Sequence, residues 1–96
     1  MNKIEIQHKL EGNYGKFFYE ENDEVLAEMV YTIEDNDIMK ITHTNVDPIL
    51  SGKGVGTLLT KTAVEFARAN GYKIVPLCPF AAAIISKTPE WHDVIK

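Results

Sequence analysis

Two side chains in this sequence could take part in covalent chemistry, namely His43 and Cys78. A histidine titrates near neutral pH, so it can act as a general base that removes a proton from an amine or a thiol. A cysteine thiolate is a nucleophile that can carry an acyl group as a thioester before passing it on. Because exchange between two thioesters is nearly isoenergetic, such a step becomes accessible if His43 favours the thiolate form of Cys78.

Both residues also have a purely structural interpretation. Strand alternation places His43 on the same face as Met39 and Ile41, so we expect it to point toward packed apolar surface. There it would be a core histidine that is hydrogen-bonded to a neighbouring backbone group. A free cysteine is among the most buried residue types, although Pro79 directly after Cys78 indicates a strand-to-helix turn rather than deep core. The sequence leaves both interpretations open.

A glycine-rich segment between a predicted strand and a predicted helix is the strongest sign of a ligand. It runs Ser51-Gly52-Lys53-Gly54-Val55-Gly56-Thr57, with alternating glycines. The N–H groups of a helix's first turn have no partner inside the helix and lie at the positive end of its dipole, where phosphate binds well. Glycine allows close approach and unusual backbone angles. We therefore predict that this segment binds a pyrophosphate.

Two common phosphate-binding loops do not fit this segment. A Walker A loop ends in Gly-Lys-Ser/Thr, whereas Lys53 is followed by Gly54. The dinucleotide fingerprint spaces its glycines as G-x-G-x-x-G and places an acidic residue about 20 residues further on. Here the glycines alternate, and Glu65 lies too early and within the helix. The segment is therefore not that of a mononucleotide or dinucleotide site.

The elements that must position these residues follow from hydrophobic periodicity. Four strands precede the loop with short connections, which favours an antiparallel meander. A strand after the helix must lie parallel to the fourth strand, because strand–helix–strand crossovers are right-handed. The predicted strands span residues 4–7, 16–19, 25–33, 38–46 and 73–77, and the predicted helices span residues 54–69 and 80–86. Trp91 is expected to hold the last residues against the core.

The composition excludes several classes of function. We interpret the 96 residues as one domain spanning residues 1–96, and the net charge of -4 argues against a nucleic-acid or anionic-membrane surface. No apolar run reaches the roughly 18 residues of a membrane span, and residues 1–5 lack the apolar core of a signal peptide. A single cysteine excludes an internal disulfide and fits a reducing compartment, so we predict a cytoplasmic protein. Scattered histidines give no metal-ligand spacing.

The loop resembles the acetyl-CoA loop of the GNAT N-acetyltransferases. That family's motif is Gln/Arg-x-x-Gly-x-Gly/Ala at the start of a helix, and here it corresponds to Ser51-Gly52-Lys53-Gly54-Val55-Gly56. Ser51 departs from the usual Gln or Arg, while the backbone part of the motif is intact. Two further stretches look like the minimal YjdJ-type branch of GNAT-like proteins, and the likeness extends from Leu26 to Trp91. These stretches are Ile41-Thr42-His43-Thr44 and Pro76-Leu77-Cys78-Pro79-Phe80.

The resemblance implies an α+β fold with a GNAT-like mixed sheet of about five strands, in which a meander is followed by a β-α-β crossover and a short C-terminal helix. It implies that the fourth and fifth strands splay to admit the pantetheine arm of acetyl-CoA. The pantetheine amides would pair with free backbone groups near Asn45 and Val46, and the loop from Ser51 to Thr57 would hold the pyrophosphate. The thioester would lie beside His43 and Cys78.

Three functions remain open. The first is an acetyl-CoA-dependent N-acetyltransferase acting on an unidentified amine or protein acceptor, directly or through Cys78. The second is a non-catalytic acyl-CoA-binding or sensing module, and the third is a structural domain that does not bind CoA. Full-length GNAT enzymes usually carry a helical segment between their first two strands, where this chain has only the turn at residues 12–15. The acceptor therefore makes few contacts, or a partner chain completes the site, or the protein only binds CoA. We expect a monomer or a weak homodimer.

Overall fold

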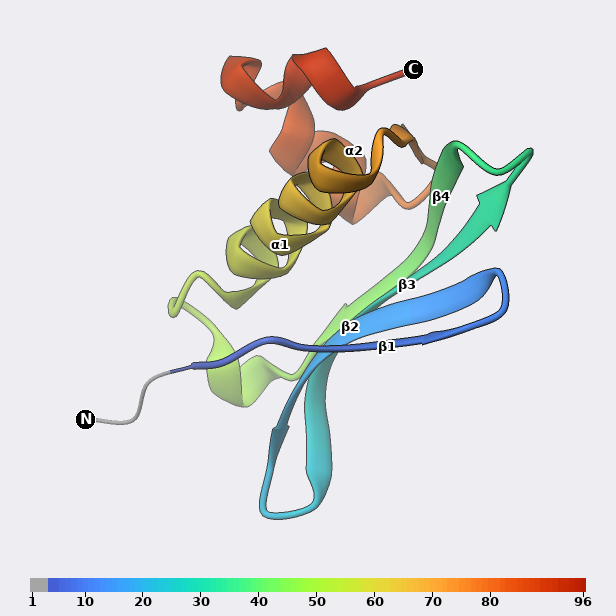
Figure 1. Cartoon of the computed structure of the whole chain (residues 1–96). Helices are drawn as coiled ribbons and strands as arrows, with labels where there is room; N and C mark the ends of the chain where they lie inside the picture. Colours follow the sequence, from blue (N-terminus) through green and yellow to red (C-terminus); the bar gives the residue numbers. More distant parts are fainter. Residues whose placement is uncertain (1–3) are drawn as a thin grey trace.

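A five-stranded mixed sheet organises the molecule (Figure 1), and the computed structural model describes residues 4–96. The strands lie in the order β1-β2-β3-β4-β5; the first four pair antiparallel, and β5 lies parallel to β4. Their bounds are Gln7–Glu11, Tyr14–Glu21, Glu24–Glu34, Ile38–Val46 and Lys73–Pro76. The predicted α+β fold is therefore confirmed, with a meander followed by a crossover.

The crossover from β4 to β5 is made by the long helix α1, which spans Val55–Asn70. Glycines with left-handed backbone angles mark both of its ends, Gly54 before the first turn and Gly71 after the last. A second helix, α2, spans Pro79–Ser86, and two short 3-10 helices are η1 at Pro48–Leu50 and η2 at Pro89–Val94. Within residues 4–96, no helix has the length and apolar character needed to cross a membrane.

The sheet has one face covered by helices and one open face. α1 contacts strands β2 to β5 and α2 contacts β4 and β5, so both helices pack on the same side (Figure 1). We call this side the covered face. The other side, the open face, carries partly exposed residues such as Lys16, Glu28 and Thr32. The core lies between the covered face and the helices and includes Phe17, Met29, Tyr31, Met39, Ile41, Leu59, Ala63 and Ile74.

The helix α1 is buried over a wide face. Leu59, Thr60, Ala63 and Val64 are all fully buried. The reason is that α2 and η2 pack against α1 from a second direction. The Thr60 hydroxyl satisfies its hydrogen-bonding need in this dry position by donating to the Gly56 carbonyl at 2.8 Å.

The first strand is the element that the sequence prediction misplaces. It is expected at residues 4–7, but β1 begins at Gln7 and runs to Glu11 along β2. All five of its side chains are largely exposed, so it lacks the apolar alternation by which a strand is recognised. A two-residue turn at Gly12 and Asn13 joins it to β2, and Gly12 has a left-handed φ of 62°.

The β2–β3 hairpin projects beyond the rest of the sheet, at the end where β4 leads into η1 (Figure 1). Its turn residues Asn22 and Asp23 have left-handed φ angles of 53° and 65°. Asn and Asp tolerate such angles better than other side chains, which makes them suitable for tight hairpin turns. The β3–β4 turn uses Asp35 and Asn36 in the same way.

Candidate functional site

The glycine loop borders a cavity of about 370 Å³ at the N-terminus of α1. The walls of this cavity come from the end of β4, from η1, from the loop and from α2. The loop contributes Ser51, Gly52 and residues 54–57, whereas Lys53 does not line the cavity. Phe80 and Ile84 of α2 close the side opposite the loop. The predicted phosphate-binding segment therefore lines a cavity.

The three glycines of the loop serve two different structural purposes. Gly52 and Gly54 have φ angles of 79° and 71°, which glycine adopts without strain. Gly56 has ordinary helical geometry, but a Cβ atom at this position would lie 2.4 Å from the ring of Phe80. The first two glycines thus shape the loop, and the third allows α2 to pack closely against α1.

The backbone N–H groups of the loop divide into engaged and available donors. Those of Ser51 and Lys53 bond to the carbonyls of Pro48 and Leu50, at 2.9 and 3.1 Å. The first N–H groups of α1, from residue 55 to residue 57, have no partner inside the helix, and no side chain caps them. The donors at the start of α1 are therefore available to an anion.

A β-bulge in β4 changes the direction of the side chains that follow it. Tyr31 of β3 pairs with Ile41, and its neighbour Val30 pairs with His43, so Thr42 is an extra residue with no partner of its own on β3. After such an extra residue the alternation of faces shifts by one position. His43 therefore does not share the face of Ile41.

The prediction that His43 points toward packed apolar surface is consequently wrong. Its side chain is exposed, and its ring bonds to the side-chain amide of Asn45 at 2.9 Å. Thr44 takes the inward position instead: it is partly buried and its Oγ1 atom is shielded from solvent. The bulge thus separates the histidine from the covered face and replaces it there by a threonine.

Cys78 is buried at the point where β5 ends and α2 begins. Its N–H donates to the Ile41 carbonyl of β4 at 3.0 Å. Burial alone would raise the pKa of the thiol, but the Thr44 hydroxyl and the N–H groups of Ala81 and Phe80 act more strongly in the opposite direction. The pKa of Cys78 therefore lies below its usual range, which favours the nucleophilic thiolate.

The strands β4 and β5 part beside this cysteine. Their last pair is Ile41 with Pro76, and Pro76 has no N–H with which to continue the ladder. The N–H groups of Leu77 and Cys78 both turn to the Ile41 carbonyl, at 2.9 and 3.0 Å. From Thr42 onward, β4 therefore has no strand paired on its β5 side within the described residues.

The backbone groups that face this gap follow from the pairing on the other side of β4. The Asp47 N–H donates to the Leu26 carbonyl at 2.7 Å, and antiparallel residues alternate between hydrogen-bonded and non-hydrogen-bonded pairs. Asn45 is therefore in a hydrogen-bonded pair and turns its backbone groups toward β3. Thr44 and Val46 are in non-hydrogen-bonded pairs, so their backbone groups point into the gap.

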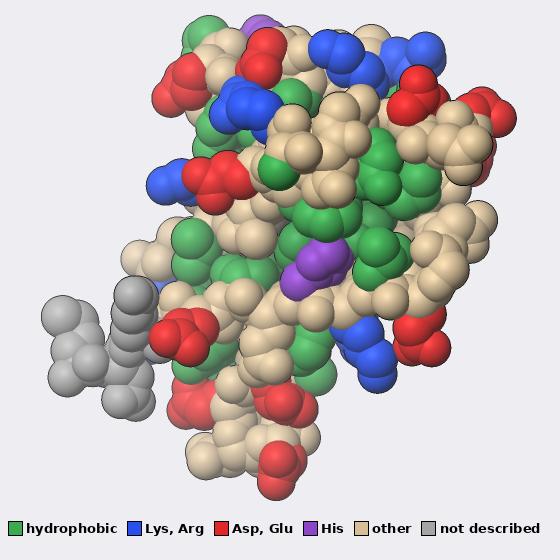
Figure 2. Space-filling view, in the orientation of Figure 1, with side chains coloured by type: hydrophobic (Ala, Val, Ile, Leu, Met, Phe, Trp, Pro, Cys, Tyr) green, Lys and Arg blue, Asp and Glu red, His purple; other side chains and the backbone are tan. Residues whose placement is uncertain are grey.

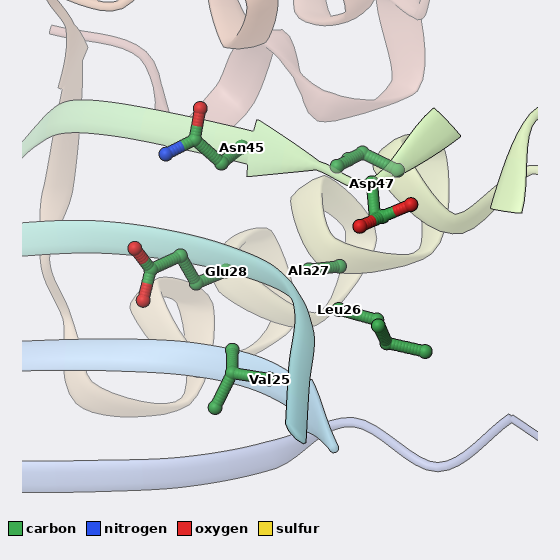
Figure 3. Close-up of a pocket in the computed structure, with 7 residues that line it drawn as sticks. Val25, Leu26, Ala27, Glu28, Asn45 and Asp47 are labelled. Atoms are coloured by element: carbon green, nitrogen blue, oxygen red, sulfur yellow. The ribbon is translucent and has the colours of Figure 1, made fainter. Parts of the chain in front are cut away.

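A second cavity, of about 330 Å³, lies where β3 and β4 run side by side (Figure 3). Residues 25–28 and 45–47 line it. The carboxylate of Glu28 and the carboxamide of Asn45 project from adjacent strands here (Figure 3). This cavity shares Val46 and Asp47 with the cavity at the glycine loop, so the two hollows meet at the end of β4.

The sequence analysis missed a cluster of rings around His8. The view in Figure 2 shows hydrophobic side chains gathered around a histidine. His8 stacks on Phe17 with ring centroids 4.3 Å apart, meets Phe66 edge-on at 4.6 Å, and bonds through Nε2 to the Tyr31 hydroxyl at 2.5 Å. Burial raises the pKa of Tyr31 to about 12, so this hydroxyl stays protonated. Gly15, which pairs with Tyr31 across the strands, is the only sequence sign of the cluster.

Comparison with known proteins gives consistent results. A family model described as GCN5-related N-acetyl-transferase matches residues 16–94. The solution structure of a GCN5-like protein from Staphylococcus aureus is also similar, with 38% sequence identity and a TM-score of 0.77. The match covers 100% of this chain and 91% of the Staphylococcus aureus chain.

Two further relatives match over shorter stretches. A GNAT family acetyltransferase from Elizabethkingia anophelis, solved with acetyl-CoA bound, is 22% identical with a TM-score of 0.57 over 67% of this chain and 42% of that one, which shows likeness of the fold alone. An uncharacterized N-acetyltransferase of Methanocaldococcus jannaschii is 38% identical over 48 residues. That match covers 50% of this chain but only 21% of the longer relative.

Proposed function

The chain belongs to the family of GCN5-related N-acetyl-transferases, and from this premise we propose that it binds acetyl-CoA and transfers the acetyl group to an amine through Cys78. The observation that carries the proposal is the gap between β4 and β5, which has Cys78 at its closed end. The glycine loop lies beyond the other end of the same stretch of β4. A cofactor with a pyrophosphate, an extended arm and a terminal thioester fits this layout.

The cofactor is held mainly by backbone groups. The uncapped N–H groups at the start of α1 would bind the pyrophosphate, aided by the helix dipole. The pantetheine amides would pair with the free backbone groups of Val46 and with the Thr44 carbonyl, much as an added strand pairs with a sheet edge. The Asn45 backbone, which turns toward β3, would not take part, although its side chain remains available to His43.

The first chemical step would be attack by the Cys78 thiolate on the carbonyl carbon of acetyl-CoA. A bond forms between that carbon and the Cys78 sulfur, and the bond from the carbon to the CoA sulfur breaks. CoA leaves as a thiolate and takes a proton from water, and the proton that Cys78 lost beforehand also passes to water. The product is an acetyl thioester on Cys78.

The second step would take place from the open face, where the cavity of Figure 3 offers room for an acceptor. An amine attacks the acetyl carbon, the amide bond forms, and Cys78 leaves as a thiolate. His43, exposed near this cavity and bonded to Asn45, would receive the proton that the amine loses. The carboxylate of Glu28 favours an acceptor that carries positive charge.

A second candidate function is a module that binds acyl-CoA without transferring the acyl group. The observation in its favour is that few residues are placed to bind an acceptor. β1 and β2 are joined by a two-residue turn, and the cavity of Figure 3 is shallow and lined by few residues. Both candidates predict that CoA raises the melting temperature. Only the transferase predicts an acetylated Cys78 that loses its acetyl group to an amine.

Intact mass spectrometry after incubation with acetyl-CoA tests the proposal, followed by peptide mapping and a chase with spermidine as the probe amine. We expect one added acetyl group on Cys78, its loss during the chase, and acetylated spermidine. A Cys78→Ala variant should bind CoA as before and gain no acetyl group. If this variant acetylates spermidine at the full rate, the covalent route is wrong and direct attack on acetyl-CoA replaces it. If CoA gives no thermal stabilisation at all, both candidate functions fail.

A further inference from the structure

We propose that Thr44 is the positioning residue that holds the Cys78 sulfur as a thiolate, with its hydroxyl and its backbone N–H both directed at that sulfur. The inference rests on the proposed function only in that Cys78 is the nucleophile there. It assigns to a threonine the task that the sequence suggested for His43.

The bulge in β4 is the first part of the argument. Because Thr42 is an extra residue, Thr44 turns to the covered face while His43 turns away from it. The Thr44 Oγ1 atom is buried, and within residues 4–96 it has no hydrogen-bond partner. A buried hydroxyl without a partner is unfavourable, so a group that accepts its proton is expected nearby.

The Cys78 sulfur, once it is a thiolate, is the acceptor that this hydroxyl would turn to. The bond from the Cys78 N–H to the Ile41 carbonyl, at 3.0 Å, fixes the cysteine against β4 at the point where the gap opens. The Thr44 N–H points into the same gap, because Thr44 is in a non-hydrogen-bonded pair with Met29 of β3. The lowered pKa of Cys78 agrees, since the hydroxyl and the N–H of Thr44 are both among its causes.

No charged side chain takes part in this arrangement. The groups that lower the pKa of Cys78 are the donors of Thr44 and the N–H groups of Ala81 and Phe80, all of them uncharged. α2 carries no titratable side chain. The titratable side chains of the other elements around the cysteine have other partners or are exposed. On β4, His43 bonds to Asn45 and Lys40 pairs with Glu34. On β5, α1 and η2, Lys73 bonds to the Asp93 carbonyl, Arg68 pairs with Asp93, His92 bonds to the Ile85 carbonyl, and Lys61 and Glu65 are exposed.

Uncharged donors suit both steps of the proposed transfer. They stabilise the Cys78 thiolate before it attacks and again when it departs from the acetyl group, and they do so without holding a proton that the reaction must move. A positioned histidine would instead exchange its proton with the thiol and would lose its effect at a pH above its own pKa. The stabilisation that these donors give the thiolate should therefore be the same at neutral and at mildly alkaline pH.

The test is the pH dependence of alkylation by iodoacetamide, which needs no CoA. Cys78 is the only cysteine of the chain, so the mass gain reports on this thiol alone. Thr44→Val keeps the shape and the strand preference but removes the hydroxyl. We expect it to raise the apparent pKa of Cys78 by about one unit and to slow alkylation at neutral pH by roughly threefold to tenfold. Thr44→Ser restores a hydroxyl and should restore the profile.

Several outcomes would overturn the inference. One is a Thr44→Val profile that coincides with that of the parent protein; another is a Thr44→Ser profile that matches Thr44→Val. A His43→Gln variant that shifts the profile as strongly as Thr44→Val would return the role to the histidine. If Thr44→Val does not fold, Thr44→Ala is compared with Thr44→Ser in the same way. Failure of acetyl transfer would leave these profiles unaffected, so the inference and the proposed function fail separately.

Discussion

The N-terminal hairpin region and the cofactor end of this protein use the same local contact for opposite purposes. In each region a glycine lies beneath an aromatic ring, Gly15 beneath Tyr31 and Gly56 beneath Phe80. A Cβ atom at either glycine would lie 2.4 Å from the ring above it. The rings differ in their surroundings, because Tyr31 is 0% exposed and bonds to His8, whereas Phe80 is 43% exposed.

The difference shows how one chain combines a rigidly packed aromatic ring, Tyr31, with one that can move, Phe80. Around Tyr31, stacked rings and a hydrogen bond fill the space, so nothing there can move without breaking other contacts. Around Phe80, solvent lies on one side and the loop cavity on the other, so the ring can turn aside. A site that admits and releases a large cofactor requires the second kind of surroundings.

The largest expected effect comes from changing one of two glycines with similar left-handed backbone angles, one in each region. Gly54 and Gly12 have φ angles of 71° and 62°, and at neither residue would an added Cβ atom have a neighbour within 4 Å. Gly54→Glu places a carboxylate at the start of α1, where it repels a pyrophosphate, so we expect CoA affinity to fall at least ~100-fold. Calorimetry with CoA measures this loss.

Gly12→Glu is the matched control for that change. Both variants place a side chain in the left-handed region, which is unfavourable by about 1–2 kcal/mol. Gly12→Glu should therefore lower the melting temperature about as much as Gly54→Glu and leave CoA binding intact. If the two variants bind CoA equally well, the assignment of the pyrophosphate to the glycine loop is refuted.

The next effect compares the two covered glycines directly. Gly15→Ala forces a methyl group against the buried ring of Tyr31, and we expect it to lower the free energy of unfolding by about 2–3 kcal/mol. Gly56→Ala displaces only the exposed ring of Phe80 and gains helix propensity, so its change should stay within about 1 kcal/mol. Urea denaturation of both variants measures the difference.

A double variant sharpens this comparison. Adding Phe80→Ala to Gly56→Ala should change the free energy of unfolding by nearly the sum of the single effects, because an exposed ring that moves aside at little cost couples only weakly to the added methyl group. Equal losses for Gly15→Ala and Gly56→Ala would mean that the ring over the cofactor end is as rigid as the ring in the hairpin. The proposed difference in mobility between Tyr31 and Phe80 would then be wrong.

The smallest effect concerns the pH dependence of the hairpin. Burial lowers the pKa of His8 from its ordinary value of 6.5. Between the lowered pKa and 6.5, the unfolded chain binds more protons at this site than the folded chain does. The contribution of His8 is therefore complete above pH 6.5 and is lost as the pH falls through its folded pKa. Because the ring is largely solvated, we expect a loss below about 1 kcal/mol.

The control for this prediction is His8→Gln, which removes the titration and can still bond to the Tyr31 hydroxyl. His43 and His92 are present in both proteins, so the difference between the two pH profiles isolates His8. Melting temperatures recorded from about pH 8 to about pH 5 measure it. Parallel profiles would mean that folding does not favour the neutral form of the His8 ring.

Much of the cofactor end could be predicted from the sequence because its signals are local. Strand β4 has the predicted bounds, Ile38–Val46, and α1 begins one residue after the predicted start. The glycines that set the loop are visible as residue types, since left-handed angles select glycine. The parallel pairing of β5 follows from the handedness of crossovers.

The faces of β4 could not be predicted, because a bulge has no reliable mark in the sequence. Alternation counted from Ile41 puts His43 inward, and the extra residue Thr42 reverses that assignment. The choice depends on pairing with β3, which is a tertiary property. The same holds for β1, whose exposed residues become a strand only because β2 lies beside them.

The projecting β2–β3 turn is a position where a segment that recognises an acceptor could be inserted. Asn22 and Asp23 form the turn, and Val25, just beyond it, already lines the open-face cavity. Extending a surface loop is thermodynamically mild, since doubling its length adds only about 0.6 kcal/mol of closure entropy. An inserted segment here would overhang the acceptor side and leave the glycine loop and Cys78 untouched. Acceptor choice could then be varied as an independent module, by evolution or by design, on a cofactor-binding scaffold that stays constant.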